Sequence, residues 1–209
     1  MTTYRVVLLA LCVAFARPVH AADQTQPSAL NPTPEAQVND LIAEYTIRYQ
    51  FNNAAQAIPV AEKALALAEQ LMGPESAKVA QILNDLGYFH QLERHFTKAQ
   101  QLHQRALKIR ERLHGNGAEL VQSLVNLGKA YAGNRKFGLA QPLYERALAI
   151  AEKNVQPNDL FLVGILTPYA ATLRGRRNTK AAYQVEMRIK QIHAAQPGAA
   201  KPSIGDVLK

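Results

Sequence analysis

The chain has 209 residues, of which 48% are hydrophobic, and its formal net charge is +8. Its one cysteine, Cys12, excludes a disulfide within the chain and a site built from several cysteines. Residues 22–93 carry 3 basic and 9 acidic side chains, whereas residues 94–209 carry 19 and 7. Such an uneven charge can steer an anionic partner to one end or favour head-to-tail self-association, although a solvated surface without a partner is the alternative.

The segment from Met1 to Ala21 is typical of a secretory signal peptide. Arg5 forms a short basic region, an apolar run extends over residues 6–16, and Val19-His20-Ala21 ends in a cleavage signal. The run is shorter than the ~20 residues that span a bilayer. We therefore expect cleavage after Ala21 and a periplasmic or secreted protein, with an uncleaved anchor as the alternative. No later segment is apolar enough to cross a membrane.

An internal repeat organises the rest of the chain. Three matching segments follow one another at nearly equal steps, at positions 64–69, 106–111 and 147–152. Midway between them, Leu83-x-x-Leu86-Gly87 matches Leu124-x-x-Leu127-Gly128. Repeats of this period with helical spacing of the apolar residues indicate two helices per repeat.

We accordingly predict four helix pairs in chain order, at residues 35–50, 54–71, 76–91, 96–113, 118–133, 138–153, 159–174 and 179–194. The flanking segments 22–34 and 195–209 are rich in Pro, Ala and polar residues, which predicts disorder. The helical repeat domain then spans residues 35–194.

Three prolines, Pro59, Pro142 and Pro168, fall inside these predicted helices. Pro142 has a counterpart at Pro59 in repeat register and lies near the start of its helix, so we expect a helix that continues through it. Pro168 has no counterpart and lies in the middle of its helix, which predicts a kink there.

A known pattern is complete in the third repeat. The spacing L-x-x-L-G-x-x-Y, followed by A-x-x-x-[FY]-x-x-A, is met by Leu124, Leu127, Gly128, Tyr131, Ala140, Tyr144 and Ala147. This resembles the tetratricopeptide repeat (TPR), and most of all the roughly 42-residue variant found in kinesin light chains and many bacterial proteins. The resemblance covers about residues 35–194, with a weaker first repeat and a last repeat that has Glu186 in place of the aromatic residue. It implies an all-α fold: a right-handed solenoid of about four antiparallel helix hairpins.

The resemblance also implies a protein or peptide partner bound in a concave groove lined by the first helix of each hairpin. Carried over by position, the groove residues are Gln81, Asn84, Tyr88, Gln91, Gln122, Lys129, Thr167 and Arg174, with Val125 as a further candidate. Amides such as Asn84 can pair with a peptide backbone, and Lys129 and Arg174 can hold a carboxylate.

No catalytic, cofactor or metal motif is present in the sequence. The histidines at 90 and 103 occupy positions held by tyrosines in the next repeat, which favours packing over metal binding, and no H-E-x-x-H spacing occurs. No nucleophile turn or phosphate loop occurs either. We therefore expect a protein that is not an enzyme and binds no cofactor.

A basic patch stands at the last turn: Arg174, Arg176, Arg177 and Lys180. Phosphate contacts need little more than such a patch, but the expected export and the lack of interleaved aromatic residues argue against nucleic acid. An acidic protein or peptide is the better candidate partner. The alternative function is a structural one, in which copies assemble through their oppositely charged ends.

Overall fold

The computed structural model describes residues 33–51, 53–115 and 117–195, all within one compact unit. The signal peptide, most of the 22–34 segment and nearly all of the 195–209 tail lie outside these residues. The described part of the chain forms eight helices and no strands: α1 (Pro34–Gln50), α2 (Ala54–Met72), α3 (Ala77–Leu92), α4 (Phe96–His114), α5 (Leu120–Gly133), α6 (Phe137–Ala151), α7 (Leu160–Gly175) and α8 (Thr179–Ala194). Thus, the predicted all-α class and its helix pairs are confirmed.

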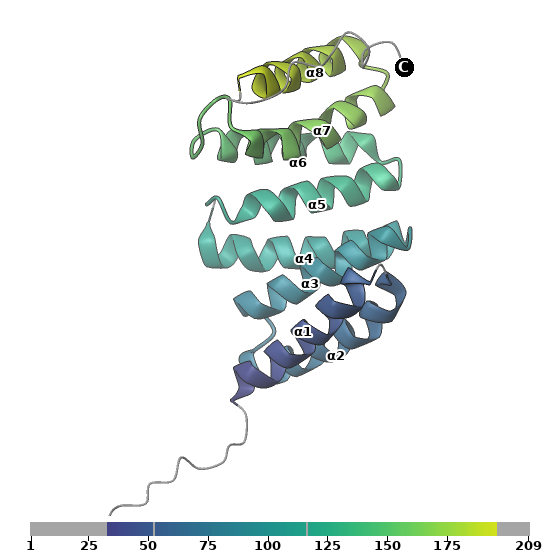
Figure 1. Ribbon diagram of the computed structural model, residues 1–209, viewed down its shortest axis with the longest axis vertical. Coiled ribbons are helices and arrows are strands. Elements are labelled where there is room, and N and C mark those ends of the chain that lie inside the picture. Colours follow the sequence, from purple (N-terminus) through teal and green to yellow (C-terminus); the bar gives the residue numbers. More distant parts are fainter. Residues whose placement is uncertain (1–32, 52, 116, 196–209) are drawn as a thin grey trace, which may run out of the picture. The chain divides into compact units, whose positions relative to one another are not determined.

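The helices pack as consecutive hairpins and follow one another in chain order, as Figure 1 shows from α1 and α2 at one end to α8 at the other. Each helix contacts the next one along the chain, and α5 also contacts α3 and α7. These odd-numbered helices therefore lie side by side, and the first helices of successive hairpins share one layer.

Polar side chains cap the N-termini of most of these helices. An N-cap oxygen accepts a hydrogen bond from a first-turn N–H in five of them, namely at Thr33, Asn53, Ser76, Asp159 and Asn178. By contrast, α4 and α6 have no side-chain cap and begin at Phe96 and Phe137. Their starts are fixed by packing, because each phenylalanine ring lies against a glycine of the following repeat.

Glycine against an aromatic ring is the recurring contact between helices. A Cβ built on Gly87 would lie 2.6 Å from the ring of His103, and one on Gly128 would lie 2.7 Å from the ring of Tyr144. Gly175 stands in the same way against Phe137, at 2.6 Å. Since real Cβ contacts are longer than this, only glycine allows the two helices to come this close.

One ion pair joins each second helix to the next. The pairs Glu69–Arg105, Glu111–Arg146 and Glu152–Arg188 each have an N–O distance of 2.5 Å. They recur at the repeat spacing and connect α2, α4, α6 and α8. Partly exposed pairs of this kind contribute at most about 1 kcal/mol each, so they fix the register of the stack more than its stability.

The three helices with an interior proline are continuous, and α2 runs through Pro59 from Ala54 to Met72. Helix α6 runs through Pro142 from Phe137 to Ala151, so the predicted continuous helix is confirmed. Helix α7 runs through Pro168 to Gly175. The kink expected at Pro168 stays a prediction.

Gly128→Ala should destabilise the protein, because the added Cβ would overlap the buried ring of Tyr144. Overpacking costs about 1–3 kcal/mol, and the gain in helix propensity offsets up to about 1 kcal/mol. We expect the free energy of unfolding to fall by roughly 1–2 kcal/mol. Urea unfolding followed by circular dichroism measures this.

Gly138→Ala is the matched control, since no atom lies within 4 Å of a Cβ at that position. It should be neutral or slightly stabilising. In a Tyr144→Leu background the Gly128→Ala change should cost less; an equal cost in both backgrounds would show that the ring does not set the glycine requirement.

Candidate functional site

An exposed stripe runs along each of the neighbouring odd-numbered helices. On α3 it includes Gln81 and Tyr88, and on α5 it includes Gln122 and Lys129. On α7 the exposed positions include Phe161, Gly164, Thr167 and Arg174. We call this set the groove face; it contains six of the eight residues proposed from the sequence.

The other two predicted groove residues belong to the interior instead. Asn84 is 6% exposed, and its Oδ1 accepts a hydrogen bond from Nδ1 of His103 at 2.9 Å. Gln91 is half-buried and donates from Nε2 to Nε2 of His103 at 2.6 Å. Asn84 therefore does not present its amide to a partner as expected, and that of Gln91 is largely engaged. Both amides hold the histidine between α3 and α4.

These two contacts also define the protonation of His103. The ring is fully buried, with Nδ1 as donor and Nε2 as acceptor, so the neutral imidazole satisfies both bonds. Burial first, and then the charge of Arg110, lowers the pKa of His103 to about 4. The sequence interpretation of this histidine as a packing residue agrees with that environment.

A second buried polar chain links α1 to α5. The Tyr45 hydroxyl donates to Oδ2 of Asp85 at 2.6 Å, and Arg110 donates to the Ser123 hydroxyl at 2.8 Å. Burial raises the pKa of Asp85, while the Tyr45 hydrogen bond and the charge of Arg110 oppose that rise. One carboxylate oxygen of Asp85 is thus bonded to Tyr45, and these side chains connect α1 with α3 and α4 with α5.

Tyr88 forms an aromatic pair at the α1–α3 end of the groove face. Its ring meets Tyr49 edge to face with centroids 5.7 Å apart, and the two hydroxyl oxygens lie 3.1 Å apart. The hydrogen bond with Tyr49, followed by burial, raises the pKa of Tyr88. This pair gives the groove face a partly exposed aromatic surface.

The basic patch contains less free charge than the sequence suggests. The Arg174 guanidinium donates to both carboxylate oxygens of Glu186, at 2.6 and 2.7 Å. This pairing raises the pKa of Arg174 and lowers that of Glu186. Arg176 donates to the side chain of Gln141, so Arg177 and Lys180 remain as the exposed cations without an assigned side-chain partner in the described structure.

A cavity of about 300 Å³ opens between α5 and α7 on the groove face. It is lined by Val121, Gln122, Val125, Lys129, Leu160, Phe161, Gly164 and Ile165. The sequence proposed Gln122, Val125 and Lys129, but the α7 residues it proposed, Thr167 and Arg174, are not the ones that line this cavity. Repeat register could have found Gly164, which occupies the place held by Gln81 and Gln122 and thus removes a long side chain from the groove.

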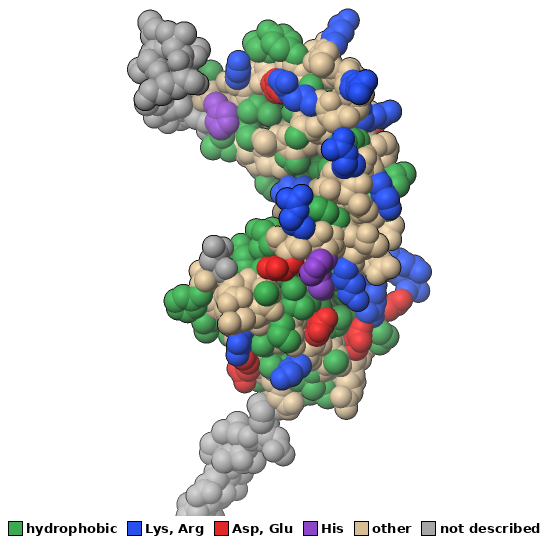
Figure 2. All heavy atoms as spheres, turned by 90° about the vertical axis from the view of Figure 1, so that its right-hand side faces the viewer, with side chains coloured by type: hydrophobic (Ala, Val, Ile, Leu, Met, Phe, Trp, Pro, Cys, Tyr) green, Lys and Arg blue, Asp and Glu red, His purple; other side chains and the backbone are tan. Residues whose placement is uncertain are grey.

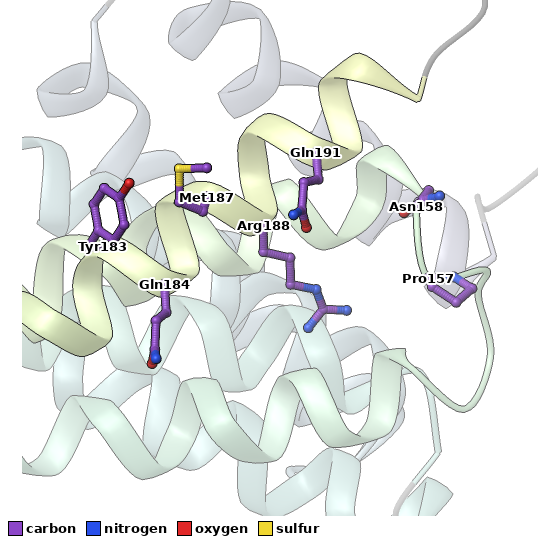
Figure 3. Close-up of a pocket in the computed structure, with 7 residues that line it drawn as sticks. All are labelled: Pro157, Asn158, Tyr183, Gln184, Met187, Arg188 and Gln191. Atoms are coloured by element: carbon purple, nitrogen blue, oxygen red, sulfur yellow. The ribbon is translucent and has the colours of Figure 1, made fainter.

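A second cavity, of about 450 Å³, lies on the outer face of α8 (Figure 3). Tyr183 and Met187 project from α8, while Pro157 and Asn158 lie on the loop that precedes α7. Its one cation, Arg188, is paired with Glu152. This surface is the open end of the stack and lacks a free charged group to recognise a ligand.

Residues 33–51, 53–115 and 117–195 contain neither a candidate metal cluster nor a candidate membrane-spanning helix. They hold no cluster of three or more His, Cys, Asp or Glu side chains with the geometry of a metal site. None of the helices among them combines the length and the apolar character that a membrane crossing requires.

Comparisons with known proteins agree with the repeat. The sequence model of the tetratricopeptide repeat matches residues 46–112 and 79–153, which together make up just over half of the chain. No curated protein matches this sequence.

Several solved structures are similar. BtubC (BKLC) from P. vanneervenii is 25% identical, with a TM-score of 0.72 over 84% of this chain and 72% of that one. A kinesin-light-chain-like protein of TPR-like repeats from Podosopora anserina is 15% identical, with a TM-score of 0.67 over 81% of each chain. The apo form of RapI is 14% identical, with a TM-score of 0.69, and this chain spans 46% of its length. The last two share the fold alone.

Acid should destabilise the fold through His103. The pKa of this histidine is about 4 in the folded chain and near 6.5 when unfolded, so the unfolded chain takes up the proton first as the pH falls. The contribution of neutral His103 to the free energy of unfolding is complete above pH 6.5. It falls by as much as about 3 kcal/mol on acidification towards pH 4. Urea unfolding from pH 7 to pH 4 measures the change.

His103→Gln is the comparison variant, because an amide can both donate to Asn84 and accept from Gln91 without titrating. The difference in unfolding free energy between the wild type and this variant isolates the histidine from the carboxylates. If that difference stays constant from pH 7 to pH 4, His103 does not carry the pH dependence.

Proposed function

The chain belongs to the tetratricopeptide repeat family, and on that premise we propose that it is an exported module that binds a peptide or partner protein on its groove face. The α5–α7 cavity carries the proposal. It joins two neighbouring first helices and combines an apolar floor with the amide of Gln122 and the ammonium of Lys129. Surfaces of this composition suit a peptide, which offers apolar side chains together with backbone donors and acceptors.

A scaffold role fits this chain better than catalysis. TPR folds are protein-interaction scaffolds, and two polar groups of the interior, His103 and the Tyr45–Asp85 pair, already have hydrogen-bond partners there. The His103 ring is held by two amides, and Tyr45 donates to Asp85. Side chains placed in this way stabilise the packing, so the proposed role is binding without chemical turnover and without a cofactor.

The charge distribution supports an acidic partner. Most acidic side chains on the visible face in Figure 2 lie in its lower half, whereas the upper half is mainly basic. Lys129 on the groove face has no carboxylate within ion-pair distance in the described residues. A partner with acidic side chains would be attracted to the basic end and could pair with this lysine. Nucleic acid is not part of the proposal.

Export rests on the sequence of residues 1–21. We expect the protein isolated from its source to begin at Ala22, because signal peptidase would cleave after Ala21. N-terminal sequencing of the protein from the cell envelope and the medium measures this. A Leu8→Arg/Leu9→Arg variant, which interrupts the apolar run, should remain in the cell; an intact Met1 in the exported protein would contradict cleavage.

Self-assembly through oppositely charged ends is the second candidate, favoured by the same charge distribution. The Glu–Arg pairs that join second helices would not extend across such a junction, since repeat register places Ala194 where the next glutamate would be. Light scattering across a salt series decides the matter: a monomer at low salt and high protein concentration rules assembly out.

Photo-crosslinking locates the partner surface. A benzoylphenylalanine introduced at Gln81 or Gln122 should crosslink a partner from an envelope extract, because both side chains are exposed on the groove face. Lys108 is the matched position outside the groove face, because it is exposed on α4, the second helix of its hairpin. It should give no such product. Equal crosslinking from Lys108 would place the partner elsewhere, and mass spectrometry identifies each product.

A further inference from the structure

We infer that one edge of the stack, formed by the α3–α4, α5–α6 and α7–α8 turns, is a docking surface for an anionic membrane, whose phosphate head groups pair with a row of arginines. We call it the turn edge. It is separate from the groove face, so the inference goes beyond the proposed function. The backbone of the turns, the charge around them and the apolar side chains beside them lead to it.

The three turns share one backbone geometry. The second residue after each first helix has a positive φ, which is 61° at Arg94, 57° at Arg135 and 62° at Arg177. Its N–H donates to the carbonyl three residues back at 2.9–3.0 Å, and the next N–H donates to the carbonyl five residues back at 2.8–2.9 Å. This is the Schellman arrangement that ends a helix, and glycine is its usual residue at positive φ because it has no Cβ.

Arginine thus stands three times where the backbone favours glycine. The equivalent position of the first hairpin in the sequence is Asn52, and asparagine is a residue type that tolerates this conformation. The turn does not require arginine, since the hydrogen bonds that define it involve only the backbone. An unfavourable conformation that recurs with the same residue indicates a role for its side chain.

The three arginines lie along one edge of the molecule. Because α3, α5 and α7 lie side by side and each ends in one of these turns, the turns lie on the same side of the stack (Figure 1). Figure 2 views this side and shows lysine and arginine side chains over its middle and upper parts. Arg94, Arg135 and Arg177 are exposed, and none has a carboxylate within ion-pair distance among the described residues. Helices pack about 8–10 Å apart, so the guanidinium groups recur at roughly that interval.

Carboxylates are almost absent from the sequence around these turns. No Asp or Glu occurs at residues 94–110, 120–144 or 160–185, which leaves Glu93 as the one carboxylate beside an arginine of the row. The turn edge therefore carries positive charge that the protein itself does not neutralise. Such a surface is attracted to anionic lipid.

Exposed apolar side chains accompany this charge. Leu92 at the end of α3 is 47% exposed, Leu139 in the first turn of α6 is 54% exposed, and Phe51 at the end of α1 is 80% exposed. In repeat register Leu139 stands where the neighbouring hairpins have the exposed Lys98 and Lys180. Apolar side chains among cations suit a lipid interface, because they enter the head-group region while arginine pairs with phosphate. A nucleic acid offers phosphates without an apolar layer, so the combination favours lipid.

Vesicle binding by residues 22–209 tests the turn edge. This form keeps the described residues, which belong to one compact unit, and leaves out the apolar run at residues 6–16. The probes are vesicles of phosphatidylglycerol mixed with phosphatidylcholine, and vesicles of phosphatidylcholine alone are the uncharged control. Cosedimentation should show binding to the anionic vesicles that weakens as the salt concentration rises, and little binding to the neutral ones.

Replacement of the arginines by glycine separates binding from folding. Arg94→Gly/Arg135→Gly/Arg177→Gly should weaken binding to the anionic vesicles at least roughly tenfold, because three cations at the lipid surface are lost. The same variant should unfold at an equal or higher urea concentration than the wild type, since glycine adopts the positive φ without a steric cost. Weaker binding by a protein that is no less stable cannot be attributed to misfolding.

Two further variants separate charge from position and from apolar contact. Lys63→Gln/Lys108→Gln/Lys153→Gln is the matched control, because it removes three charges from exposed positions away from the turn edge and should keep most of the binding. Leu92→Ser/Leu139→Ser keeps all the charges and should weaken binding several-fold at every salt concentration, since salt does not screen apolar insertion.

The possible outcomes distinguish the sources of the anion. The lack of binding to the anionic vesicles, or equal binding to the neutral ones, would overturn the inference, and so would equal binding by the arginine variant and the matched control. Competition by inorganic phosphate beyond that of chloride at the same ionic strength would indicate a site for a single anion instead of a membrane surface. Binding of polyglutamate or double-stranded DNA without binding to vesicles would replace lipid by an acidic protein or a nucleic acid. Crosslinking from Gln81 and Gln122 does not involve the turn edge, so the proposed function and this surface can fail separately.

Discussion

The close approach of glycine to an aromatic ring is the contact on which the rest of this structure depends. Gly87 admits the ring of His103 and Gly128 that of Tyr144, so the two helices of each middle hairpin pack closely. Gly133 and Gly175 admit Phe96 and Phe137, which ties the second hairpin to the third and the third to the fourth. Because this spacing recurs, α3, α5 and α7 lie side by side and a groove face exists at all.

The end repeats relax this contact, and the relaxation alters their chemistry. In repeat register Ala61 replaces the ring in the first hairpin, and Thr46 replaces the glycine. In the last hairpin Ala170 replaces the glycine and Glu186 replaces the ring. The Glu186 carboxylate accepts hydrogen bonds from Arg174. Because Glu186 stands where the previous repeat has an aromatic ring, Arg174, which was predicted as a groove cation, forms an ion pair with it instead. End repeats pack on one side only, so they tolerate such exchanges.

Polar residues along the first helices divide between surface and interior in a way that residue type does not reveal. Asn84 and Gln81 both carry amides three positions apart on α3, yet Asn84 binds His103 and Gln81 is exposed. Three positions correspond to about 300° of rotation around a helix, so two such residues share a broad face without sharing an environment. The neighbouring helix α4 decides which of the two side chains is buried, because only the side of α3 that carries Asn84 meets the His103 ring.

The sequence by itself determined the helix pairs, their period and the family, because apolar spacing and recurring glycines depend on local geometry and on nearest-neighbour packing. It also placed Gln122 and Lys129 on the groove face. Only the tertiary structure decided which polar groups were already satisfied, as with Asn84 and Arg174, and that Leu160, Phe161 and Gly164 of α7 complete a cavity with α5. A cavity and an ion pair require side chains from two different helices, either in neighbouring repeats or facing each other within one hairpin. Their distances are fixed by packing, not by spacing along the chain.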